Sequence, residues 1–127
     1  MTSTLRLRAD IAELPRLTEW IDARVAALAL DDRQAYALGL CIEELAGNVL
    51  QHGAANALQV TLRAPPLCLL FEDDGPAFDP LAVAAPTLPG NLDAATPGGL
   101  GLLLTRHYSR DLAYARHGGW NRVSVRL

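Results

Sequence analysis

Apolar residues recur along this chain at two different spacings, and these spacings predict its helices and strands. Spacing of three or four residues predicts one helix from a cap at Asp10 to about Ala29, and another from Asp31 or Asp32 to about His52. Alternating positions, and short apolar runs between turn residues, are typical of strands. Such patterns predict strands over residues 4–8, 57–63, 67–73, 112–117 and 121–127, and a further helix over residues 100–109.

The order of these elements predicts the fold class. The order β-α-α-β-β-loop-α-β-β is typical of an α/β (α+β) two-layer sandwich, with helices on one face of a mostly antiparallel mixed sheet. At 127 residues the chain fits one domain, residues 1–127, with a core of its own. Prolines interrupt every period over residues 75–98, so this segment is predicted to be a long loop.

Composition narrows the classes of function. The chain contains no lysine, which excludes a P-loop lysine, a Schiff-base lysine and the lysine of ordinary protein kinases. Its net charge of −3, without a long run of either sign, gives no electrostatic footprint for nucleic acid. The apolar runs are too short to cross a bilayer and no secretory signal pattern is visible, so we expect a cytoplasmic protein without a membrane partner.

Three polar patterns, in a fixed order, are candidates for chemistry. Glu44 and Asn48 stand four residues apart, so on an α-helix they share a face and place a carboxylate beside an amide oxygen, which suits a proton acceptor and Mg²⁺. Asp73-Asp74-Gly75 ends a predicted strand, where a carboxylate can accept hydrogen bonds from an amino group. The glycines of residues 98–101 open the last predicted helix and offer backbone N–H groups to phosphate. Together, in this order, they suggest an ATP site.

These residues resemble the motifs of the GHKL (Bergerat-fold) ATPases, and among them the anti-sigma-factor serine kinases of bacteria. Glu44 and Asn48 match an E-x-x-x-N box, Asp73 and Gly75 match a D-x-G box, and Gly99-Leu100-Gly101 matches a G-x-G box. The resemblance implies that Asn48 binds Mg²⁺, that Glu44 is the general base or orients one, and that Asp73 reads the adenine amino group of ATP. It also implies that the glycine segment meets phosphate.

Two places depart from the family's pattern. Ala77 stands where the family usually has a second glycine, which bears on how closely the backbone meets the nucleotide. Asn121-Arg122-Val123 stands where the family's kinases commonly carry a threonine-containing segment that supports the adenine-binding aspartate. The sequence therefore leaves open what supports Asp73.

The resemblance implies an ATP-binding regulatory protein that phosphorylates an antagonist protein, sequesters a sigma factor, or does both, and it suggests a homodimer formed through the first strand. A sensor histidine kinase is disfavoured, because the chain lacks room for a separate phosphoacceptor and dimerisation helix. Two alternatives stay open. One is a non-catalytic module that binds nucleotide or only sequesters a protein partner. The other is a metal-dependent hydrolase that uses Glu44, His52 and Asp73.

Overall fold

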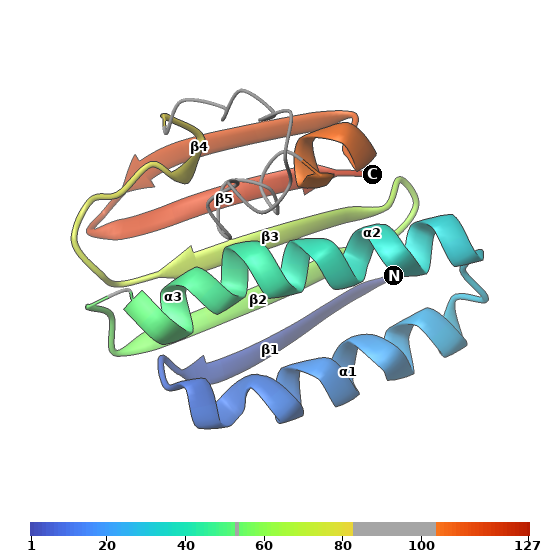
Figure 1. The fold of residues 1–127 in the computed structure, drawn as a ribbon, viewed down its shortest axis with the longest axis horizontal. Coiled ribbons are helices and arrows are strands. Elements are labelled where there is room, and N and C mark those ends of the chain that lie inside the picture. Colours follow the sequence, from blue (N-terminus) through green and yellow to red (C-terminus); the bar gives the residue numbers. More distant parts are fainter. Residues whose placement is uncertain (53, 83–103) are drawn as a thin grey trace, which may run out of the picture.

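One antiparallel sheet forms the centre of the protein. The computed structural model describes residues 1–52, 54–82 and 104–127, and within them five strands pair in the order β1-β2-β3-β5-β4 (Figure 1). Each neighbouring pair of strands is antiparallel. The strands are β1 (Thr2–Arg8), β2 (Ala57–Arg63), β3 (Cys68–Asp73), β4 (Asp111–His117) and β5 (Trp120–Arg126).

Helices α1 (Leu14–Ala27), α2 (Asp32–Cys41) and α3 (Gly47–His52) lie on one face of this sheet (Figure 1). Asp31 begins α2 with a capping box, in which its side chain accepts from the Gln34 backbone N–H and its own N–H donates to the Gln34 side chain. The fold class predicted from the sequence is therefore confirmed: a layer of helices packs on one face of a layer of strands.

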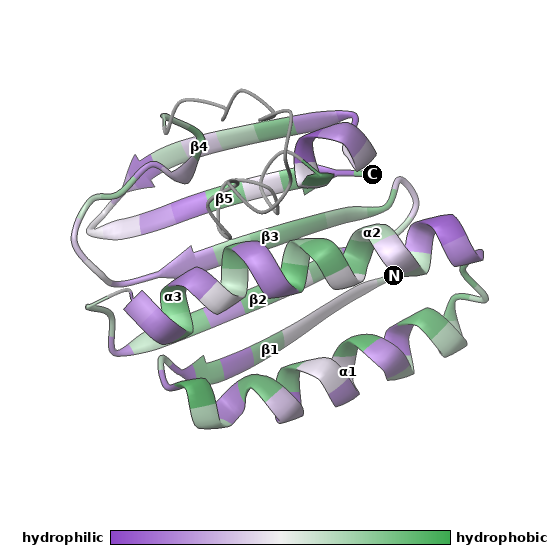
Figure 2. Cartoon of the chain, in the orientation of Figure 1, coloured by the Kyte–Doolittle hydropathy of each residue, from purple (hydrophilic) through white to green (hydrophobic). Residues whose placement is uncertain are grey.

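The core lies between the helices and the inner face of the sheet. Alternate residues of each strand face the helices, so one side of the sheet is apolar and the other is polar. Figure 2 shows hydrophobic residues along α2 and the middle strands, and a hydrophilic end of β3. Fully buried side chains of this core include Leu17, Leu38, Leu58, Val60, Leu62, Leu69 and Val125.

The outer face of the sheet carries a polar row that crosses four strands in register. Arg6 donates to Gln59 at 2.8 Å, Gln59 donates to Glu72 at 3.4 Å, and Glu72 forms an ion pair with Arg122 at 3.2 Å. Because polar side chains occupy this face, the apolar helices pack only on the other one.

The second helix differs from the prediction, whereas the last hairpin and the last helix agree with it where they are described. The second predicted helix is not one continuous α-helix, because a π-helical turn, Ile42–Ala46, separates α2 from α3. The last hairpin turns at Gly118 and Gly119 as predicted, and both adopt positive φ values, +55° and +81°, as a two-residue turn of this kind requires. Residues 104–108 are helical within the predicted helix 100–109, and residues 83–103 lie outside the described part.

Candidate functional site

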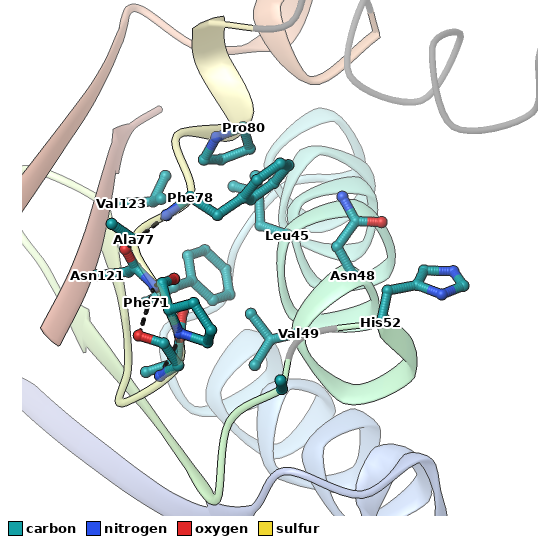
Figure 3. Close-up of a pocket in the computed structure, with 14 residues that line it drawn as sticks. Leu45, Asn48, Val49, His52, Phe71, Ala77, Phe78, Pro80, Asn121 and Val123 are labelled. Carbon is teal, nitrogen blue, oxygen red and sulfur yellow. Dashed lines mark hydrogen bonds between the residues drawn. The ribbon is translucent and has the colours of Figure 1, made fainter.

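A pocket of about 450 Å³ opens between α3 and the ends of β3 and β5 (Figure 3). Its size falls in the range of small-molecule sites, and apolar side chains form most of its wall, with a few polar groups among them. The apolar lining comprises Leu45, Val49, Ala54, Phe71, Pro76, Ala77, Phe78, Pro80 and Val123. The remaining lining residues are Asn48, His52, Asp73, Gly75 and Asn121.

The helical side of the pocket presents Asn48 and His52, one turn apart on α3 (Figure 3). Glu44 lies in the π-helical turn before them and is not among the described residues that line the pocket. Hydrogen bonds in a π-turn span five residues, so the helix that joins Glu44 to Asn48 is not the uninterrupted α-helix that the sequence pattern predicts. The sequence did not reveal this turn.

Glu44 nevertheless has the electrostatics of a proton acceptor. Burial raises the pKa of the Glu44 carboxyl above its ordinary value, and the neighbouring charge of Glu43 raises it further. A carboxylate with a raised pKa binds a proton more readily at neutral pH, which is the property a general base needs. The assignment of Glu44 as general base stays a prediction.

The opposite side of the pocket presents Asp73, the last residue of β3. Its Oδ1 accepts one hydrogen bond from the Gly75 backbone N–H at 3.0 Å and another from the Asn121 side-chain amide at 3.0 Å. No donor from the described residues bonds to the other oxygen, Oδ2. Asp73 therefore keeps an acceptor for a ligand while its first oxygen fixes its orientation.

Gly75 allows the chain to turn tightly beside this carboxylate. A Cβ at this position would lie 3.0 Å from Asp73 Oδ1 and 3.2 Å from the Ala55 Cβ. Both distances are shorter than ordinary van der Waals contact, so any side chain here would displace the carboxylate or the segment behind it. A glycine at this position avoids a shift of a few tenths of an ångström in the carboxylate or in Ala55.

Asp74 faces a different task from its neighbour. Its Oδ1 accepts from the backbone N–H groups of Asn56 at 2.8 Å and Ala57 at 3.0 Å. These hydrogen bonds, that from Ala57 first, lower the pKa of the Asp74 carboxyl. Asp74 thus ties the start of β2 to the end of β3, whereas Asp73 lines the pocket.

Asn121 is the site residue whose role the sequence left open. Its side chain is 4% exposed, and it connects Asp73 to the segment 76–78 that forms one wall of the pocket. It occupies an inner-facing position of β5, two residues before the buried Val123. A polar residue in such a position must find hydrogen-bond partners. An asparagine at an inner-facing position of a strand was therefore the feature of the sequence that could have indicated its role.

The predicted phosphate-binding residues Gly99, Leu100 and Gly101 lie outside the described residues. Arg106, in the helical residues 104–108, donates to the Leu81 backbone carbonyl at 2.8 Å and is exposed.

The metal-dependent hydrolase alternative is not supported. In residues 1–52, 54–82 and 104–127, no three His, Cys, Asp or Glu side chains converge as metal ligands, so Glu44, His52 and Asp73 do not form such a site. A Mg²⁺ ion brought with phosphates makes a smaller demand, since it usually takes one or two oxygen ligands from the protein. The Asn48 amide oxygen at the pocket fits that role.

A comparison with known families identifies the family of the chain. Residues 7–127 match the family described as the histidine kinase-like ATPase domain. The chain belongs to this family. The resemblance to GHKL ATPases, inferred from the motifs, is thereby confirmed.

A relative of this ATPase domain has a named activity. The chain is 34% identical over 134 residues to the serine/threonine-protein kinase BtrW of Bordetella bronchiseptica, in an alignment that covers 98% of this chain and 92% of the relative. Within the described part of this ATPase domain, no helix has the length and apolar character needed to cross a membrane.

Proposed function

We propose that this ATPase domain binds Mg·ATP in the pocket beside Asp73 and transfers the terminal phosphoryl group to a serine or threonine hydroxyl of a partner protein. The observation that carries the proposal is Asp73 Oδ2, to which no described residue donates, at one side of an apolar pocket in a chain of this family. A flat aromatic base with an amino group fits that combination, since the walls cover its faces and the carboxylate accepts its N–H.

Each polar residue then has a distinct task. Asp73 accepts a hydrogen bond from the adenine amino group, and the Asn48 amide oxygen would hold a Mg²⁺ ion, which would supply positive charge to offset that of the phosphates. Glu44 takes the proton of the attacking hydroxyl. That hydroxyl oxygen bonds to the terminal phosphorus, the bond from this phosphorus to the bridging oxygen breaks, and ADP leaves with its electron pair. Gly99, Leu100 and Gly101 are proposed to meet the phosphates through backbone N–H groups.

The partner is proposed from the resemblance to anti-sigma-factor kinases. It is a small antagonist protein that supplies the acceptor hydroxyl, a sigma factor that the domain sequesters, or both. The named kinase activity of the relative supports phosphoryl transfer to a protein. A homodimer through β1 remains part of this proposal.

A second function is favoured by one observation. Glu44 is not among the described residues that line the pocket, so a module that binds nucleotide or a partner protein without phosphoryl transfer fits the same fold. The two functions differ in whether ADP forms when a substrate protein is present.

Calorimetry with Mg·ATP tests the binding step. We expect saturable binding at one site, and a loss of at least tenfold in affinity for Asp73→Ala, since a hydrogen bond to a charged group contributes about 1.5–3 kcal/mol. A folded wild-type protein that gives no response at millimolar Mg·ATP would contradict the proposal. ADP release in the presence of a candidate antagonist protein then distinguishes the kinase from the non-catalytic module.

A further inference from the structure

The buried amide of Asn121 is a hydrogen-bonding centre for the pocket (Figure 3). Its Nδ2 donates to Asp73 Oδ1 at 3.0 Å and to the Pro76 carbonyl at 2.8 Å. Its Oδ1 accepts from the Phe78 backbone N–H at 3.1 Å, the Tyr114 hydroxyl at 2.6 Å and the Arg116 guanidinium at 3.2 Å. The side chain therefore connects β3, β4 and the segment after β3.

These partners fix the orientation of the amide. Acceptors, a carboxylate and a carbonyl, face the nitrogen, whereas N–H and O–H donors face the oxygen. A rotation that exchanged the two ends would bring the Asn121 oxygen against Asp73 and leave the Phe78 N–H without its partner. Because such unpaired groups are costly when buried, the amide has one stable orientation.

We propose that Asn121 is a positioning residue that sets the base selectivity of this pocket. It holds Asp73 through Oδ1 so that Oδ2 stays available to an amino group, and at the same time it fixes the wall residues Pro76 and Phe78. The inference rests on the proposed binding of ATP. The inference explains how the pocket distinguishes a purine that carries an amino group from one that carries a carbonyl oxygen at the same position.

The chemistry of an amide explains why this residue type suits the position. An amide nitrogen has two hydrogens, so Asn121 reaches the carboxylate and the Pro76 carbonyl together, whereas a hydroxyl has a single hydrogen and can serve only one of them. Arg116 also donates to the Gly75 carbonyl at 2.7 Å, which fixes the same turn from β4. The carboxylate and the wall are thus held by one buried side chain.

The test compares ATP with inosine triphosphate, which carries an oxygen in place of the amino group. Wild type should prefer ATP, since Asp73 accepts from an amino group and repels a carbonyl oxygen. In Asn121→Ala the preference for ATP over inosine triphosphate should fall by about tenfold, in addition to any loss of affinity that both nucleotides share through the wall residues. Val125→Ala is the matched control, because it creates a cavity on the same face of β5 but away from the pocket. It should lower the stability of the fold without changing the preference for ATP over inosine triphosphate.

A second variant of Asn121 and a double-mutant cycle with Asp73 complete the test. Asn121→Asp, close in size, places an acceptor against Asp73 and should also lose the preference, so it replaces Asn121→Ala if that variant does not fold. In an Asp73→Ala background the Asn121 substitution should no longer change the preference for ATP over inosine triphosphate, because its effect on selectivity passes through Asp73. A folded Asn121 variant that keeps the wild-type preference overturns the inference alone. A wild type that binds neither nucleotide overturns the proposed function as well.

Discussion

Asp73 of β3 and Asn121 of β5 are direct cross-strand partners, and the Asn121 Nδ2 lies 3.0 Å from Asp73 Oδ1. In the register of the sheet, Leu58 of β2 is the other neighbour of Asp73, and Arg116 of β4 is the other neighbour of Asn121, so these four residues form one row across the sheet. Its apolar part lies under the helices and its polar part borders the pocket. Strand register therefore decides that the pocket-lining carboxylate has a buried amide beside it.

Gly75→Ala should weaken nucleotide binding. The new Cβ would lie 3.0 Å from Asp73 Oδ1, so either the carboxylate rotates or the turn moves away from Ala55. We expect ATP affinity to fall by about tenfold, comparable with loss of one charge-assisted hydrogen bond, when measured by calorimetry. Gly39→Ala is the control, because a Cβ there meets nothing within 4 Å. Unchanged ATP affinity in folded Gly75→Ala would show that the turn adapts at no cost.

Asn48→Ala should weaken binding chiefly through the metal. If the Asn48 amide oxygen holds Mg²⁺, the variant loses affinity for Mg·ATP but resembles wild type when nucleotide is titrated in EDTA. Gln51→Ala, at an exposed position of α3 outside the pocket lining, is the matched control and should leave Mg·ATP affinity unchanged. Equal losses for Asn48→Ala with and without Mg²⁺ would exclude the metal role and leave only a packing role.

Glu44→Ala should leave Mg·ATP binding largely intact and remove phosphoryl transfer, since proton abstraction and metal binding are separate tasks. Single-turnover phosphorylation of the partner protein, once it is known, measures this. Transfer at the wild-type rate would show that another group takes the proton.

Glu44→Gln should make stability less sensitive to pH. The pKa of Glu44 is raised from its ordinary 4.5, so the folded state holds this proton more tightly than the unfolded chain does. The resulting stabilisation is present below pH 4.5 and is lost as the pH rises through the raised value. The melting temperature of Glu44→Gln minus that of wild type should therefore be larger at pH 7 than at pH 4. Glu19→Gln, at an exposed position of α1, is the control.

Asp74→Ala should lower stability by about 1 kcal/mol, because the N–H groups of Asn56 and Ala57 lose a charged acceptor. The pKa of Asp74 is lowered, so its contribution is present above the ordinary value of 3.8 and is lost as the pH falls through the folded value. Urea unfolding at neutral and acidic pH measures both effects. ATP affinity should stay near that of wild type, in contrast to Asp73→Ala, and a larger loss for Asp74→Ala would reverse the division of tasks between the two carboxylates.

The sequence by itself determined the elements and most of the candidate residues. Local patterns were sufficient for β2, whose bounds Ala57–Arg63 match the prediction, and for the cap at Asp31, because alternation and capping depend on residues close in sequence. The resemblance of the boxes further identified the family, which the family comparison confirmed. Asn48, Asp73 and Gly75 all line one pocket, as an ATP site requires.

Only the tertiary structure decided how these residues are held. The π-helical turn Ile42–Ala46 has no sequence signal of its own, since its residues are ordinary helix formers, and it interrupts the predicted helix between Glu44 and Asn48. Asn121 could be seen as a polar residue among apolar ones, but its partner Asp73 is 48 residues away. Strand order and register bring them together. Burial then makes the pairing obligatory, because an amide removed from water must find its hydrogen bonds within the protein.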